Sequence, residues 1–338
     1  IVGRSGGNIS SNVVFGITAF DSNTSGTNTV AIGINALTAN TSGASNTAVG
    51  SYAMETNTTG QGNTAVSAFA LYYNTTGNYN VGIGKYALQF NTTGSFNTGI
   101  GLDALGSNST GNNNTAIGSG ALSASVNPYN NVAIGYNALY GATIPDLTVA
   151  IGQFALSNAT YSDWNVAIGA GAMDSVYNSQ GNVAIGHGAM IDAWSLTHQL
   201  VGNVAIGDQA LSHNIGDNNI AIGYFAGFAL INGSHNVIIS GSSTSAPAMS
   251  PTMSGNIIIA NGLGTVGFWM LPSGYTGIGG ETNPTQSLHV TGNARITGAY
   301  YDSNNDPGTS GQVLSSTVTG TDWVAAASGS GSGTVTSI

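Results

Sequence analysis

The segment NTTGNYNVGIGKYAL, residues 74–88, contains one turn of the pattern that organises this chain of 338 residues. Its GIG core returns as AIG, AVG or a close variant, usually every 17 residues, and the last glycine of that core serves here as an anchor for alignment. The spacing lengthens by four before Gly207 and shortens by one before Gly223. A recurrence of this kind is typical of stacked repeat architectures. The fourteen anchors are Gly16, Gly33, Gly50, Ser67, Gly84, Gly101, Gly118, Gly135, Gly152, Gly169, Gly186, Gly207, Gly223 and Ser240.

Each copy carries apolar residues at fixed places around its anchor. Val, Ile or Thr stands three residues before it, and Ile or Val stands one before it in all copies but the first, with a small residue, usually Ala, between them. Side chains alternate along a strand, so the outer two share one face. We expect that face, with Val81 and Ile83 in this copy, to fill the core together with Leu88 from a second short strand. The small residue then faces outward.

The remainder of each copy is turn chemistry built from Asn, Ser, Thr and Gly. Asn also stands four residues before the anchor in twelve of the fourteen copies, as in Asn46, Asn63 and Asn80. In stacked coils these amides are expected to bond along the stack. The variable residue directly after the anchor is expected to face solvent. The sequence therefore predicts an all-β fold, a parallel β-solenoid (β-roll) of 17-residue coils, whose fourteen coils at ~4.8 Å spacing give a rod of roughly 65 Å.

The end of the chain departs from this pattern. We predict a solenoid region over residues 1–262, which includes closing coils at 237–239 and 256–259, and a small non-repeat β segment over 263–325. Within that segment, 285–301 alternate as two strands joined at 291–293. Residues 326–338 are rich in Gly and Ser and are expected to form a linker.

Composition excludes several classes of function. Only 5% of residues are charged, and Lys and Arg number three, too few for a surface that neutralises a row of phosphates, so nucleic-acid binding is not expected. The chain has no cysteine, which rules out disulfides and thiolate metal sites. It has no run of about 18 apolar residues, and its start does not resemble a signal peptide, so membrane insertion is not expected either.

The repeat N-T-A-I-G-x-x-A-L-x-x-N-T-T-G resembles the head repeats of long bacteriophage tail fibres. It is more distantly similar to the β-roll heads of trimeric autotransporter adhesins. The stretch from GIGGETNPTQSLHV to TGTDWV resembles the segment that follows such repeats in phage fibres. The resemblance implies a homotrimer on a virion, outside the cell, that contacts a glycan or protein of the host surface. The recurrent Ala two residues before the anchor is then either a site of close approach between chains or simply exposed to solvent.

Residues that carry chemistry are few and scattered. The GIGK of residues 82–85 lacks the first Gly and the final Ser or Thr of a phosphate loop. The thirteen acidic residues occupy different places in the repeat, with Asp192 and Asp208 nearest to a pair, and the five His residues show no metal-ligand spacing, although His198 and His213 flank one region. We therefore expect no enzyme activity, no cofactor and no metal.

Two sets of residues remain as candidate sites. The four-residue insertion lengthens one turn and places Trp194, Leu196, His198 and Leu200 on a loop, where they are candidate receptor contacts unless Trp194 folds back onto the coil. Sequons recur seven residues after the anchor and are candidate glycosylation sites, although the sequence Asn-Thr-Thr-Gly also favours a turn without any sugar. These sites are Asn40, Asn57, Asn74, Asn91 and Asn108.

We expect a structural fibre segment of a phage tail or similar appendage, acting as a rigid spacer and host-surface adhesin. The alternatives are the head of a bacterial trimeric surface adhesin, located on the cell surface, and a polysaccharide-degrading tailspike. Exposed aromatic residues next to the anchors are expected to form a stripe or an intersubunit contact. They are Tyr52, Phe69, Tyr86, Tyr136, Phe154, Tyr224 and Phe225.

Overall fold

The computed structural model describes residues 11–143, 145–192, 199–241, 250–261, 265–295, 301, 312–317 and 320–325. The chain divides into two compact units, Ile1–Thr291 and Gly292–Ile338. Across the described residues every regular element is a strand, and no helix is long and apolar enough to cross a membrane.

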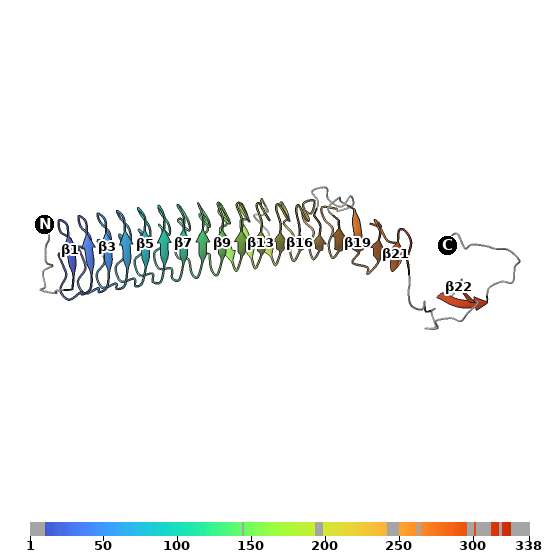
Figure 1. Ribbon diagram of the computed structural model, residues 1–338, viewed down its shortest axis with the longest axis horizontal. Helices are drawn as coiled ribbons and strands as arrows, with labels where there is room; N and C mark the ends of the chain where they lie inside the picture. Colours follow the sequence, from blue (N-terminus) through green and yellow to red (C-terminus); the bar gives the residue numbers. More distant parts are fainter. Residues whose placement is uncertain are drawn as a thin grey trace. The chain divides into compact units, whose positions relative to one another are not determined.

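The first unit is a stack of parallel coils, each of which contributes one strand of three or four residues to a long sheet (Figure 1). Every strand pairs in register with the equivalent strand of the next coil, so that Val81 lies beside Thr98 and Ile83 beside Ile100. The predicted parallel β-solenoid of about 17 residues per coil is confirmed. Its strands are β1 Val13–Phe15, β2 Val30–Ile32, β3 Thr47–Val49, β4 Thr64–Val66, β5 Val81–Ile83, β6 Thr98–Ile100, β7 Thr115–Ile117, β8 Val132–Ile134, β9 Val149–Ile151, β11 Val166–Ile168, β13 Val183–Ile185, β15 Val204–Ile206, β16 Ile220–Ile222, β17 Val237–Ile239 and β18 Ile257–Ala260.

The interior is filled from the strand face opposite to the one that the sequence indicated. The middle residue of each three-residue strand in this stack, such as Ala116, is buried, whereas Val81 is half-buried and Ile83 is exposed. The prediction that Val and Ile fill the core is wrong. The cause is the narrow interior, since the Leu of each coil also lies inside: a Cβ added at Gly82 would lie 3.2 Å from Cγ of Leu71. Only a small side chain fits opposite that leucine.

The corner after each strand is a turn, not the predicted second short strand. Leu88 and Tyr86 both have positive φ, at 54° and 65°, which L-residues rarely adopt. The anchor is constrained further, because Gly84 has a φ of +129° and an added Cβ would lie 2.4 Å from the carbonyl oxygen of Gly101. Only glycine tolerates this geometry without strain. Ser67 nevertheless occupies an anchor position with a φ of 113°.

Two ladders of buried asparagine amides run along the stack. On the strand side, Oδ1 of Asn63 accepts from the backbone N–H of Asn80 at 2.8 Å, and its Nδ2 donates to the carbonyl of Gly77 at 2.8 Å. The predicted ladder is thereby confirmed. On the turn side, Nδ2 of Asn74 donates to Oδ1 of Asn57 at 2.8 Å and to the carbonyl of Gly77 at 3.0 Å. Each coil is therefore tied to its neighbours by side chains as well as backbone.

The turn-side ladder ends partway along the solenoid. Its last consecutive member is Asn108, and the same place is taken in the next four coils by buried Ser125, Ala142, Ala159 and Val176. The last two of these coils, together with the coil that follows them, form a second parallel sheet of β10 Tyr161–Asp163, β12 Asn178–Gln180 and β14 Leu200–Val201. The first two contribute only isolated bridges at Tyr129 and Asp146.

The end of the solenoid is closed by a short antiparallel excursion. Strand β18 pairs with β19 Val266–Met270, which pairs with β20 Thr276–Ile278, and β20 pairs in parallel with β21 Leu288–Val290. Trp269 is buried opposite Ile258, and its Nε1 donates to Oδ1 of Asn256, the last rung of the strand-side ladder. This tryptophan covers the open end of both the apolar core and the amide ladder.

The first unit continues to Thr291, past the predicted solenoid end at 262, because β19–β21 extend its sheet. Of the two strands predicted over 285–301, the described residues contain β21, whereas 296–300 lie outside them. The second unit contains the hairpin of β22 Gln312–Thr317 and β23 Gly320–Ala325, and the predicted linker at 326–338 lies outside the described residues.

Candidate functional site

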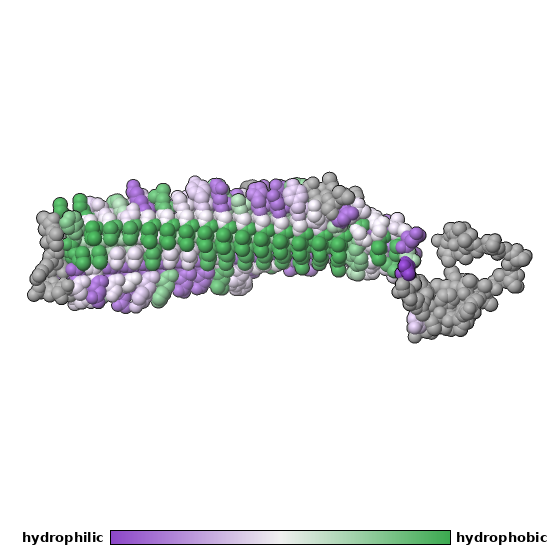
Figure 2. Space-filling view, in the orientation of Figure 1, coloured by the Kyte–Doolittle hydropathy of each residue, from purple (hydrophilic) through white to green (hydrophobic). Residues whose placement is uncertain are grey.

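The strand face that points away from the interior carries a continuous band of apolar side chains. We define the outer band as the residues one and three before each anchor, in β1–β9, β11, β13 and β15–β17. Figure 2 shows this band following the strands along the solenoid, with more polar residues beside it. Its isoleucines remain accessible, with exposed fractions of 37% for Ile83, 37% for Ile117 and 41% for Ile239. Both alternatives for the small Ala, close approach between chains and exposure to solvent, are wrong, because that residue lies inside. The side chains that this face presents are Val, Thr and Ile.

Aromatic residues beside the anchors form a local stack. The rings of Tyr52 and Phe69 are parallel with centroids 5.0 Å apart, and Tyr86 continues the stack at 5.6 Å. Nζ of Lys85 lies 4.7 Å from the centroid of Tyr86. Most ring faces in this cluster therefore contact one another rather than solvent. Elsewhere the predicted stripe is reduced to separate pairs, Tyr136 with Phe154 and Tyr224 with Phe225.

One tyrosine beside this stack has a perturbed ionisation. A hydrogen bond to Glu55, reinforced by partial burial, raises the pKa of Tyr72 to about 12. The carboxylate accepts from the neutral phenol and repels the phenolate, so both effects have the same sign. The pair joins two successive coils and fixes the Tyr72 ring against its neighbours.

The candidate receptor contacts fall mostly outside the described residues, which exclude 193–198 and therefore Trp194, Leu196 and His198. Leu200 is described, and it is a core residue of β14 that is 2% exposed. It is therefore not a surface contact. Trp194, Leu196 and His198 stay predicted receptor contacts.

The candidate glycosylation sites lie in the turn-side ladder. In the folded coil their amide nitrogens donate to the neighbouring coil and to their own turn, and the structure leaves no space for a sugar on them. The geometry favours the alternative that these asparagines stabilise the turns. Asn40, Asn57, Asn74, Asn91 and Asn108 all have no exposed surface.

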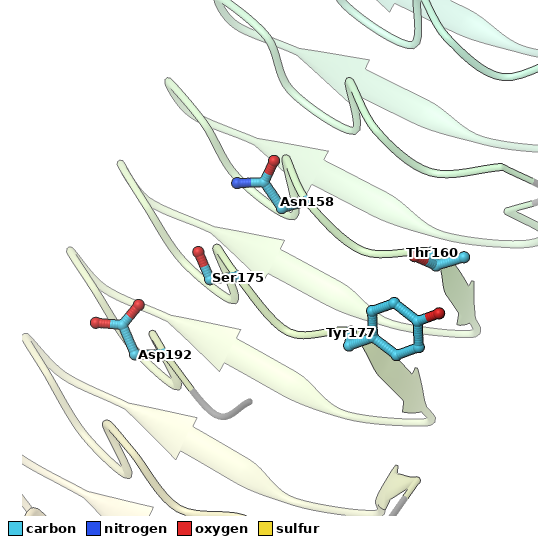
Figure 3. Close-up of a pocket in the computed structure, with 5 residues that line it drawn as sticks. All are labelled: Asn158, Thr160, Ser175, Tyr177 and Asp192. Carbon is cyan, nitrogen blue, oxygen red and sulfur yellow. The ribbon is translucent and has the colours of Figure 1, made fainter. Parts of the chain in front are cut away.

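Where the turn-side ladder is missing, the surface is hollowed into two adjoining depressions, which we call the polar groove. The larger has a volume of about 580 Å³ and is lined by Asn158, Thr160, Ser175, Tyr177 and Asp192. Figure 3 shows Asn158, Ser175 and Asp192 at the same place on three successive coils, with Thr160 and Tyr177 beside them in a second row. Between the rows in sequence lie the buried Ala159 and Val176 that replace the ladder asparagines.

The smaller depression continues the groove towards the N-terminal coils. It has a volume of about 320 Å³ and shares Asn158 with the larger one. Its other lining residues are Asn137, Tyr140, Phe154, Ser157 and Asp174. This site was not predicted from the sequence. The signal that could have found it is the run of four consecutive coils without the ladder asparagine.

Titratable residues near the groove form pairs, not clusters. Nε2 of His213 lies 3.9 Å from Oδ2 of Asp192, and Nδ1 of His187 lies 3.5 Å from Oδ1 of Asp208. The four side chains are between 44% and 66% exposed. Within the described part of the chain, no three His, Cys, Asp or Glu residues are grouped so that they could hold a metal ion.

Comparison of the chain with protein-family models, with curated proteins and with solved structures finds no match. The class of protein is thus defined by the fold itself: an all-β repeat protein built as a parallel β-solenoid.

Proposed function

We propose that the chain is a structural segment of an extended surface fibre, belonging to a phage tail or a similar virion appendage. In this role it acts as a rigid spacer and as an adhesin towards the host surface, and it assembles as a homotrimer. The observation that carries the proposal is the outer band, an apolar surface that repeats in register through every coil. Apolar surfaces of this extent on a protein in water mark sites of association.

The geometry of the band favours another copy of the same chain as its partner. Each coil presents the same two positions at the same height, with Val, Ile or Thr at the first and mostly Ile or Val at the second, so a parallel copy would meet similar residues along the whole stack. Burial contributes roughly 25 cal/mol per Å² of apolar surface, and the contributions add from coil to coil. Weak contacts per coil thereby become a stable assembly, whereas a compact partner would cover only a few coils.

The mechanical role follows from the bonding between coils. Backbone ladders and buried amides tie each coil to the next, and three such rods side by side resist bending more than one. Repetition and trimerisation also multiply any weak contact with a receptor through effective concentration.

Immunogold electron microscopy with antibodies raised against the chain tests this proposal. We expect label along the tail appendages of virions. Label on the surface of bacterial cells would instead support the adhesin-head alternative, and label confined to the cell interior would contradict the proposal.

A further inference from the structure

We infer that the polar groove is a binding site for an uncharged saccharide. The inference rests on the proposed adhesive function for its biological role, but its evidence is the local structure alone. The groove lies on the turn side of the coils, where the second sheet replaces the amide ladder, and it is separate from the outer band.

The volume and length of the groove suit a short oligosaccharide. The two depressions, of about 580 and 320 Å³, fall within the range of small-molecule sites. Their lining residues come from four successive coils, which at ~4.8 Å per coil extend over roughly 14 Å. Because both depressions share Asn158, one elongated ligand can occupy both.

The chemistry of the lining matches a ligand rich in hydroxyl groups. Tyr177 presents a ring with a phenolic hydroxyl at one wall, and Tyr140 and Phe154 present rings in the smaller depression. Aromatic rings provide apolar surface for the C–H face of a sugar, while the polar groups bind its hydroxyls. Among the described residues, the side-chain hydroxyls of Thr160 and Ser175 have no protein hydrogen-bond partner, so they are available to a ligand.

Part of the site is fixed in advance by Asp174. Its Oδ1 accepts from Oγ of Ser157 at 2.6 Å, from Nδ2 of Asn158 at 2.9 Å and from the backbone N–H of Ser175 at 2.9 Å. These bonds orient the Asn158 amide, which can still donate its second N–H and accept through its oxygen. A preorganised amide of this kind binds without an additional cost of ordering.

Charge restricts the class of ligand. The groove contains the carboxyl groups of Asp174 and Asp192, and the only Lys and Arg residues of the chain are Arg4, Lys85 and Arg295, none of which lines it. An acidic sugar would therefore meet like charge with no Lys or Arg to compensate it, and His213 is already paired with Asp192. The ligand class that fits is a neutral saccharide.

The test is binding of the full chain to an array of neutral, acidic and amino oligosaccharides, with affinities of the bound probes measured by titration. We expect neutral probes to bind, with an affinity that changes little with salt. The substitution Tyr177→Ala should weaken binding about tenfold or more. Tyr161→Ala is the matched control, because Tyr161 is an exposed tyrosine of the same region that does not line the groove.

A second variant tests the groove in case Tyr177→Ala does not fold. Ser175→Trp places a large side chain in the middle of the groove and should abolish binding while thermal unfolding of the chain stays unchanged. Absence of binding to every neutral probe, preference for acidic probes, or equal affinities of the wild type and both groove variants would each overturn the inference. The immunogold result is independent of these outcomes, so the groove and the fibre proposal can fail separately.

Discussion

Replacement of Asn74 by Ala removes one rung of the turn-side ladder. Nδ2 of Asn74 donates two hydrogen bonds, to Asn57 and Gly77, and its Oδ1 accepts one from Asn91 at 2.8 Å. A buried hydrogen bond contributes about 1 kcal/mol net, so the loss of three amounts to about 3 kcal/mol. Because coils contact only their neighbours, this loss is expected to open the stack locally rather than to unfold it as a whole.

Hydrogen exchange followed by mass spectrometry measures this local opening. A loss of about 3 kcal/mol corresponds to exchange about a hundredfold faster in peptides that span residues 74–91. Thr76→Ala is the control, since Thr76 is exposed in the same turn and its side chain makes no hydrogen bond to a described residue. If Asn74→Ala exchanges no faster than Thr76→Ala, the amide ladder does not hold the turns together, and the reasoning fails.

Three further predictions concern strain, association and ionisation. Ser67→Gly should raise the free energy of unfolding by about 1 kcal/mol, because it relieves the strain of a positive φ of 113°. The control Ser119→Gly, next to an anchor, should not stabilise the chain, so equal melting temperatures of the two variants would contradict this. Ile117→Glu, in the outer band, should place like charges against one another between chains at a cost of several kcal/mol, so that sedimentation shows single folded chains. For Tyr72, stability from its bond to Glu55 should be present below pH 10 and lost as pH rises towards 12, and ultraviolet titration of Glu55→Gln should return the phenol pKa towards 10; an unchanged titration would show that this hydrogen bond is not the cause.

The repeat period was sufficient to predict the stack, the register and the strand-side amide ladder. It could not decide which strand face is internal, because alternation separates Val81 and Ile83 from Gly82 without saying which side is enclosed. The width of the interior decides this, and it depends on how the corner turns. One clue was present: Thr replaces Val at the first of these positions in several copies, as in Thr98 and Thr115, which is unusual for a fully buried site.

The conformation of the corner could not be read from the sequence. Leucine with a positive φ is rare, so the alanine-leucine pair looked like a short strand. In the final coils one small residue is compensated by one larger residue. Gly227 stands where the earlier coils have a larger apolar residue, mostly Leu, and Ile238 stands where the earlier coils have Ala or Gly, apart from Val14 in the first coil. Cδ1 of Ile238 lies 3.4 Å from the position that a Cβ on Gly227 would take. Such compensation depends on contacts between coils that a single repeat does not contain.

The polar groove was missed for a related reason. Its residues, among them Asn158, Ser175 and Asp192, are ordinary turn residues that lie one coil apart in sequence, and they converge only because the coils are stacked. The charge restriction, in contrast, was visible in the composition, because three basic residues in the whole chain leave few sites for an anionic ligand.

The mass of the chain in solution, measured by sedimentation equilibrium over a range of concentrations, tests the central proposal most directly. A homotrimer assembled through the outer band predicts three times the chain mass of 33.7 kDa, persisting on dilution and at high salt, as apolar contacts require. A mass of 33.7 kDa at every concentration would show that the outer band does not join copies of the chain, and would contradict the account.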